Sequence, residues 1–163
     1  MRVVSNTSPL SNLAIIGRLD LLLARYGRVI IPPAVAAELQ ALTHSGGSAA
    51  IHEAIRAGWL LIEPLPAKNE AARLRDALDA GEAEAIALGA ATGADVLLLD
   101  ERRGRFFARQ FGLNLGGVLG ELLHAKLAGA IPSMKSEITR LRADARFFIS
   151  ASIEAFFLKE AGE

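Results

Sequence analysis

Residues 93–100 read GADVLLLD, which is the clearest strand signal in the chain. An unbroken Val-Leu-Leu-Leu run follows a glycine and ends at Asp100. Such a run, bounded by turn residues, is typical of a strand that is buried on both faces of a parallel sheet. Helical patterns stand on either side of it, GEAEAIALGAAT at 81–92 and RGRFFARQ at 103–110. The stretch therefore predicts a central strand between two helices.

The same alternation of strand and helix runs through the rest of the chain. Four more short apolar runs predict strands: RVVS at 2–5, RVII at 28–31, WLLIEPL at 59–65 and LNLGG at 113–117. Ser8 and Pro9 fit the N-cap and first residue of a helix after the first run. THSGGS at 43–48 is typical of a loop. We therefore expect an α/β fold with a mostly parallel sheet.

The composition fits one folded domain. The chain has 163 residues, 52% of them hydrophobic, so it can bury a sizeable core. We expect the main domain over 1–131, with 132–163 as a C-terminal helical extension packed on it. Lys and Arg number 18, as do Asp and Glu, which argues against a protein that coats nucleic acid but allows a nuclease with a local basic rim.

Several other classes of protein are excluded or disfavoured. The absence of cysteine excludes disulfides and a cysteine zinc site. No glycine-rich phosphate loop is present, which argues against an NTPase or an NAD enzyme. No apolar run is long enough to span a membrane, and no signal peptide is evident, so we expect a cytoplasmic protein without membrane contact.

Acidic and amide side chains fall where a parallel sheet would gather them. Asn6 follows the first predicted strand and Asp100 ends the central one, so both are expected at the same sheet edge. Glu38 lies in the helix after the second strand, and Glu82 in the first turn of the helix at 81–92. Each alone has a structural explanation, as a cap, a turn former or a solvated residue. Together, carboxylates at one edge would repel one another, and Mg²⁺ or Mn²⁺ would relieve that repulsion.

A basic stretch follows Asp100 directly. Arg102, Arg103 and Arg105 would stand beside the predicted metal site, where guanidinium groups can pair with phosphate. The alternative is a solvated turn in which these arginines form ion pairs with Glu101. The combination of carboxylates, a hard cation and arginines points to phosphoryl chemistry.

Four stretches taken in order resemble one family. They are VVSNTSPLSNLAIIGRLDLL at 3–22, VIIPPAVAAEL at 29–39, LDAGEAEAIALGAATGADVLLLDERRGR at 78–105 and LGGVLGELLHAKLAGAI at 115–131. Together they are similar to PIN-domain proteins, in the branch of small prokaryotic VapC-like toxins. The resemblance implies a three-layer α/β/α sandwich of about five strands. It also implies a Mg²⁺- or Mn²⁺-dependent endoribonuclease that acts on RNA, with a small antitoxin protein as partner and often a homodimer.

The resemblance also assigns roles to residues of this chain. The positions that match the catalytic and metal-binding set of the family are Asn6, Glu38, Glu82 and Asp100. Positions that could contact these ligands without binding the ion themselves are Ser8, Glu84 and Glu101, with Thr7 as an alternative to Ser8. Phosphate binding would fall to Arg102, Arg103 and Arg105.

Asn6 departs from the family pattern, which has an aspartate there. An amide can offer its carbonyl oxygen to Mg²⁺ but adds no negative charge, so metal binding should be weaker. A second hypothesis is therefore a catalytically impaired PIN module that acts by binding a partner protein or RNA. A third is a receiver-like domain with Asp100 as phosphoacceptor, although no lysine follows at a later strand end.

Overall fold

A five-stranded sheet forms the centre of the molecule in the computed structural model, which describes residues 1–163. All its pairings are parallel, in the order β3-β2-β1-β4-β5. The strands are β1 (Val3–Ser5), β2 (Val29–Ile31), β3 (Leu60–Ile62), β4 (Val96–Leu98) and β5 (Leu115–Gly116). The predicted parallel α/β sheet is confirmed, and each strand falls within its predicted stretch.

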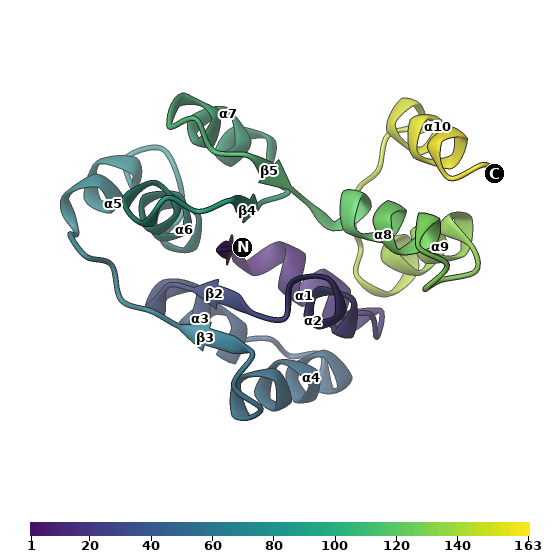
Figure 1. The fold of residues 1–163 in the computed structure, drawn as a ribbon, viewed down its shortest axis with the longest axis horizontal. Coiled ribbons are helices and arrows are strands. Elements are labelled where there is room, and N and C mark those ends of the chain that lie inside the picture. Colours follow the sequence, from purple (N-terminus) through teal and green to yellow (C-terminus); the bar gives the residue numbers. More distant parts are fainter.

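Ten helices surround this sheet. They are α1 (Thr7–Ile15), α2 (Asp20–Tyr26), α3 (Pro33–Gln40), α4 (Ser45–Arg56), α5 (Asn69–Leu74), α6 (Ala80–Thr92), α7 (Arg102–Gln110), α8 (Val118–Leu127), α9 (Met134–Asp144) and α10 (Ala151–Glu160). Figure 1 shows α5, α6 and α7 on one side of the sheet and α1, α2 and α4 on the other. The sheet is thus the middle layer of an α/β/α sandwich. None of the helices combines the length and apolar character that crossing a membrane requires.

The register of the central strands explains where the polar residues emerge. Val4 of β1 lies opposite Ile30 of β2 and Leu97 of β4, and all three are buried. Parallel strands end at the same edge of a sheet, so the residues after β1 and β4 must be neighbours. The backbone N–H of Asn6 accordingly donates to the Leu98 carbonyl oxygen at 2.9 Å.

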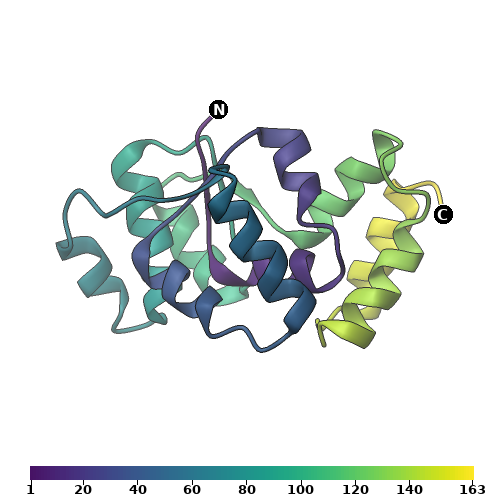
Figure 2. The same ribbon diagram turned by 90° about the horizontal axis from the view of Figure 1, so that it is seen from below.

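The C-terminal helices gather at one end of the molecule, together with α8 (Figures 1 and 2). Met134, Ile138 and Leu141 of α9 are fully buried and belong to the same hydrophobic cluster as the strands. α10 differs, because none of its own residues is buried. Residues 132–163 therefore share the core through α9, while α10 lies at its surface.

The predicted start of the first helix is wrong by two residues. α1 begins at Thr7, and Asn6, whose backbone is extended (φ −76°, ψ 175°), takes the N-cap position that was expected for Ser8. The Asn6 side chain makes no capping hydrogen bond. Pro9 can still lie in the first turn, because the first N–H groups of a helix have no partner within it.

The loop predicted at 43–48 is also wrong, since α4 begins at Ser45. His44 acts as the N-cap, and its Nδ1 accepts a hydrogen bond from the Gly47 N–H at 2.9 Å. Gly47 is buried, and a Cβ there would lie 3.2 Å from Ile15 and 3.3 Å from Leu42. Close packing on α1 therefore outweighs the low helix propensity of the two glycines.

Candidate active site

Asn6 stands at the carboxyl edge of the sheet with one polar atom unpaired. The residue is 2% exposed, and its Oδ1 is buried without a hydrogen-bond partner. Its Nδ2 donates to Glu101 Oε2 at 3.3 Å. The amide group therefore directs its donor at a carboxylate and leaves its acceptor free, which is the atom that a cation would use.

Glu82 supplies a second unpaired oxygen from the first turn of α6. Asp79 caps this helix by accepting from the Glu82 N–H at 2.8 Å, which fixes where the Glu82 side chain begins. The residue is 7% exposed, and its Oε1 is buried without a partner. Burial, followed by the charges of Asp79 and Glu101, raises the pKa of Glu82 from 4.5 to about 7.

The space around Glu82 depends on a glycine of the neighbouring helix. A Cβ added at Gly104 of α7 would lie 2.6 Å from Glu82 Oε1 and 3.1 Å from the Leu99 side chain. The missing side chain at Gly104 is therefore what allows α7 to pack on the buried carboxylate.

Glu38 joins the first turns of α1 and α6. One carboxylate oxygen accepts from the Thr7 hydroxyl, and the other accepts from the Gly81 N–H at 3.0 Å. A Cβ at Gly81 would overlap the Glu38 carboxyl group, 2.7 Å from its Cδ. Because Thr7 adjoins Asn6 and Gly81 adjoins Glu82, Glu38 connects the two helix starts that carry the unpaired oxygens.

Asp100 and Glu101 are consecutive, but their side chains reach different elements. Glu101 accepts from Asn6, whereas Asp100 Oδ1 accepts from the Val118 N–H at 2.9 Å, at the start of α8. Asp100 Oδ2 is buried without a partner. Burial raises the pKa of Asp100 from 3.8 to about 7, with the Val118 hydrogen bond opposing this rise. The acid beside Asn6 is thus Glu101, which the sequence pattern had placed only behind the ligands.

Two of the predicted supporting residues lie in different settings. Glu84 accepts from the Ala34 N–H at 2.9 Å and so caps the start of α3. Ser8 has a buried hydroxyl without a partner in the first turn of α1. Glu84 therefore has a structural partner of its own, and the free hydroxyl of Ser8 remains available.

The three predicted phosphate-binding arginines also differ in their contacts and exposure. Arg105 donates to the carbonyl oxygens of Leu99 at 2.6 Å and Gly116 at 3.0 Å, so it joins the ends of β4 and β5. Arg102 and Arg103 are exposed, and neither forms an ion pair. The predicted alternative, ion pairs between these arginines and Glu101, is not observed.

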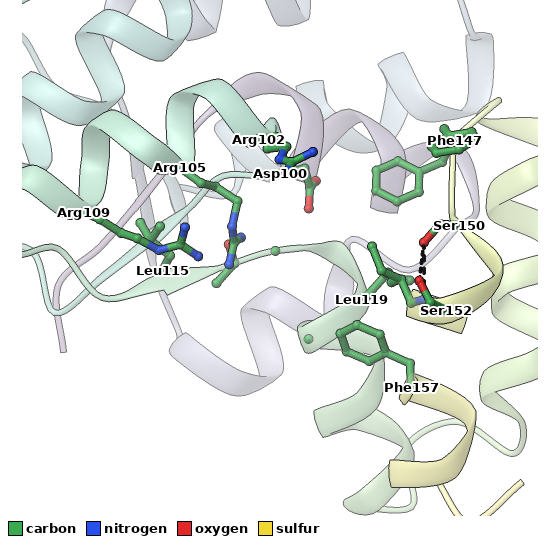
Figure 3. Close-up of a pocket in the computed structure, with 15 residues that line it drawn as sticks. Asp100, Arg102, Arg105, Arg109, Leu115, Leu119, Phe147, Ser150, Ser152 and Phe157 are labelled. Carbon is green, nitrogen blue, oxygen red and sulfur yellow. Dashed lines mark hydrogen bonds between the residues drawn. The ribbon is translucent and has the colours of Figure 1, made fainter. Parts of the chain in front are cut away.

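A pocket of about 700 Å³ opens next to Asp100. Figure 3 shows Arg102, Arg105 and Arg109 of α7 on one side of it and Phe147, Ser150, Ser152 and Phe157 on the other, with Asp100 between them. Arg109 and these C-terminal residues were not among the predicted site residues. The spacing of Arg102, Arg105 and Arg109, which repeats every three to four residues, could have indicated that the arginines share one helix face.

A family model described as PIN domain matches residues 2–163 of this sequence. The chain belongs to the PIN-domain family. No curated protein gave a significant match. The match extends across α9 and α10, so the family pattern includes the C-terminal helices as well as the sheet. PIN-domain proteins have a nuclease-type fold and generally use divalent metal ions.

The donor atoms of this PIN domain fit a hard divalent cation in type. Asn6 Oδ1, Glu82 Oε1 and Asp100 Oδ2 are buried oxygens without a partner, and burial with the charges of Asp79 and Glu101 raises the pKa of Glu82 to about 7. No group of three or more His, Asp or Glu side chains is arranged to hold a metal ion. Mg²⁺ commonly keeps several water ligands and uses one or two carboxylates, so the residues present suit an ion with few protein ligands.

Proposed function

We propose that this PIN-domain protein is a Mg²⁺- or Mn²⁺-dependent endoribonuclease of VapC toxin type. The observation that carries the proposal is a set of buried oxygens without a partner at the carboxyl edge of the sheet: Asn6 Oδ1, Glu82 Oε1 and Asp100 Oδ2. Buried polar atoms are normally hydrogen-bonded, so unpaired acceptors gathered at one edge need a ligand to account for them. A strongly perturbed carboxyl group at such a place is typical of functional sites.

Each residue would have a separate task in this activity. Asn6, Glu82 and Glu101 would hold the ion, which when bound activates water and neutralises charge on the phosphate. Glu38 would keep the first turns of α1 and α6 in position through Thr7 and Gly81. Arg102 would pair with the RNA backbone. Asp100 would add its unpaired Oδ2 to the ligands of the ion, while the hydrogen bond between its Oδ1 and Val118 fixes the start of α8.

Further features of the proposal rest on the family resemblance. They are a small antitoxin protein as partner and a homodimer. Co-purification with the gene product encoded beside this chain, followed by mass measurement of the complex, would test both.

The proposed activity can be tested by RNA cleavage. Purified protein is incubated with a mixture of structured and unstructured RNAs in Mn²⁺ or Mg²⁺, beside Glu82→Gln and Glu101→Gln variants. Glu53→Gln is the matched control, because Glu53 is exposed on α4 and pairs only with Arg56. We expect cleavage by the wild type and the control, and at least a hundredfold loss in the two site variants, as is usual when a catalytic polar group is removed.

Equal cleavage by all four proteins would show that the activity belongs to a contaminant or another site. No cleavage by the wild type over a wide set of RNAs would also contradict the nuclease proposal. Asp100→Asn tests the neighbouring acid, because it keeps the acceptor for Val118 and removes the charge of the carboxylate, and it should also lower activity.

A second candidate function is a catalytically impaired PIN module that binds a partner protein or RNA without cutting. The Asn6–Glu101 hydrogen bond favours it, because an amide donor stabilises the Glu101 carboxylate without any cation. Asn6→Asp replaces that donor with a second carboxylate. If the impaired module is correct, this variant should bind Mn²⁺ more tightly in a calorimetric titration and gain cleavage activity. If neither rises, the amide is not what limits this site.

A further inference from the structure

The pocket beside Asp100 is a groove between two separate parts of the chain. α7 forms one side, residues 147–157 form the other, and the turn from β5 to α8 lies between them (Figure 3). We call this feature the α7–α10 groove. Its two sides differ in chemistry, because the α7 side carries arginines and the 147–157 side carries phenylalanines.

The arginines of the groove form no ion pair. Eight ion pairs occur in the structure, and none includes an arginine of α7. Arg102 and Arg109 are exposed, whereas burial lowers the pKa of Arg105, with the Asp100 charge opposing this change and the Arg109 charge adding to it. Most arginines elsewhere in the chain pair with glutamates, for example Arg18 with Glu137. Crowded, unpaired guanidinium groups on one wall indicate an anionic ligand.

The spacing of the arginines favours an extended ligand. Arg102 and Arg109 are seven residues apart on one helix, which corresponds to roughly 10 Å along its axis. Both line the groove. A chain of phosphates matches this separation better than a single phosphate group does.

The opposite wall offers aromatic surface. Phe147, Phe148 and Phe157 all line the groove, and Phe148 is 88% exposed. An aromatic ring that is so exposed loses the benefit of burial unless a ligand covers it. Unpaired bases of a single strand stack on such rings, while its phosphates pair with basic side chains.

We propose that the α7–α10 groove binds single-stranded RNA, with its phosphates on Arg102 and Arg109 and a base stacked on Phe148. The identity of the ligand as RNA rests on the proposed nuclease function. The groove lies beside the carboxyl edge of the sheet, since Asp100, which follows β4, lines it. The groove would therefore carry the strand on one side of the cleavage site.

The test measures binding apart from cleavage. A fluorescently labelled single-stranded RNA of about 10 nucleotides, a length typical of single-strand sites, is titrated with full-length protein in EDTA, and anisotropy is recorded at several salt concentrations. The variants are Arg102→Gln/Arg109→Gln and Phe148→Ala. Arg75→Gln is the matched charge control, because Arg75 is exposed at the end of α5 and does not line the groove.

The two variants should differ in their salt dependence. Loss of two phosphate contacts should make the slope of log affinity against log salt shallower by about 1.4, because each contact to a single strand contributes about 0.7. Phe148→Ala should lower affinity about fivefold or more without changing the slope, since stacking is not an ionic contact. Arg75→Gln should leave the slope unchanged. These three results together would support the groove.

Other results would overturn it. Equal effects of Arg75→Gln and the double arginine variant would show general electrostatic attraction instead of a groove. Unchanged binding in Phe148→Ala, or equal competition by a mononucleotide, would also contradict the proposal and leave this face to another ligand, such as a protein. Groove-dependent binding without any cleavage in Mn²⁺ would support the groove and contradict only the nuclease function, whereas cleavage with unaltered binding in the variants would do the reverse.

Discussion

Two groups of buried glutamates in this molecule differ in how they are paired. Glu137 is 2% exposed and accepts from Arg18 at 2.7 Å and Arg140 at 3.2 Å. Glu121 is 3% exposed and accepts from Arg25 and from the Tyr26 hydroxyl. Glu82 is almost as deeply buried, yet its Oε1 has no partner.

Whether a buried glutamate has a partner distinguishes a structural role from a candidate functional one. Burying a carboxylate costs free energy unless cations and hydrogen bonds compensate it. Arginines compensate the buried charges of Glu121 and Glu137, between the C-terminal helices and α1–α2. Glu82, at the carboxyl edge of the sheet, has no such partner. Uncompensated burial at Glu82 is therefore best explained by a ligand that completes the site.

The largest expected effect is on the free energy of unfolding, and it distinguishes Glu137 from Glu82. Glu137→Ala should lower the free energy of unfolding by about 2 kcal/mol, below the full cost of breaking a buried pair because Arg18 is partly exposed. Glu82→Ala removes an unpaired charge and should cost less than about 1 kcal/mol without added metal. Urea unfolding in EDTA measures both. Similar losses would contradict the distinction.

Gly104→Ala should have the next largest effect. The new Cβ would lie 2.6 Å from Glu82 Oε1 and 3.1 Å from Leu99, so α7 must shift, at a cost of about 1 to 3 kcal/mol. Gly120→Ala in α8 is the control, because nothing lies within 4 Å of a Cβ there. That substitution should stabilise the protein by up to about 1 kcal/mol through helix propensity. Thermal unfolding of both variants would reveal the opposite signs, and equal changes would argue against close packing at Glu82.

Glu82 should also change how the stability of the protein depends on pH. The pKa of Glu82 rises from 4.5 to about 7 on folding, so the folded state holds a proton that the unfolded state has lost. Glu82 should therefore lower stability progressively as the pH rises from 4.5 to 7. Glu82→Gln should remove this part of the decline, as followed by melting temperature in EDTA, while Asp100 contributes a similar decline that remains.

A pH dependence unaltered in Glu82→Gln would show that its carboxyl group titrates normally. Mn²⁺ should raise the melting temperature of the wild type above pH 7 and not that of Glu82→Gln, because a ligand that binds the folded state stabilises it.

The smallest expected effect is at Glu163. Its carboxylate accepts from the N–H groups of Met134 at 2.6 Å and Lys135 at 3.0 Å, which lowers its pKa to about 2. The contribution to stability is present above pH 4.5 and is lost as the pH falls toward 2. Glu163→Gln should therefore lower the melting temperature slightly at pH 7, and the gap to the wild type should narrow at pH 3. A constant gap would indicate that packing, not charge, ties Glu163 to α9.

The sheet could be predicted because its signals are local. The apolar runs at 96–99 and 29–31 predict buried strands directly. Strict alternation with helices leaves a parallel sheet as the simplest arrangement. The start of α4 could not be predicted in the same way, because the two glycines there are helical only through packing of Gly47 on Ile15 and Leu42.

The sequence indicated where the candidate residues lie in the fold but not where their side chains point, and their roles stay a prediction. The sequence predicted that Asn6, Glu38 and Glu82 would come to one sheet edge, and the contacts through Thr7, Gly81 and Glu101 connect them there. At the end of β4 it favoured Asp100, although Glu101 reaches Asn6. Neighbouring residues at a strand end direct their side chains differently, and a one-residue choice of this kind depends on tertiary partners such as Val118.

Soaking a crystal in Mn²⁺ would show whether the carboxyl edge of the sheet binds a divalent cation. We predict anomalous density next to Asn6 Oδ1, Glu82 Oε1 and Glu101, with the remaining ligands being Asp100 Oδ2 and water, and no such density in Glu82→Gln crystals. Density only beside Asp100, or none at this sheet edge at saturating Mn²⁺, would contradict the proposed metal site.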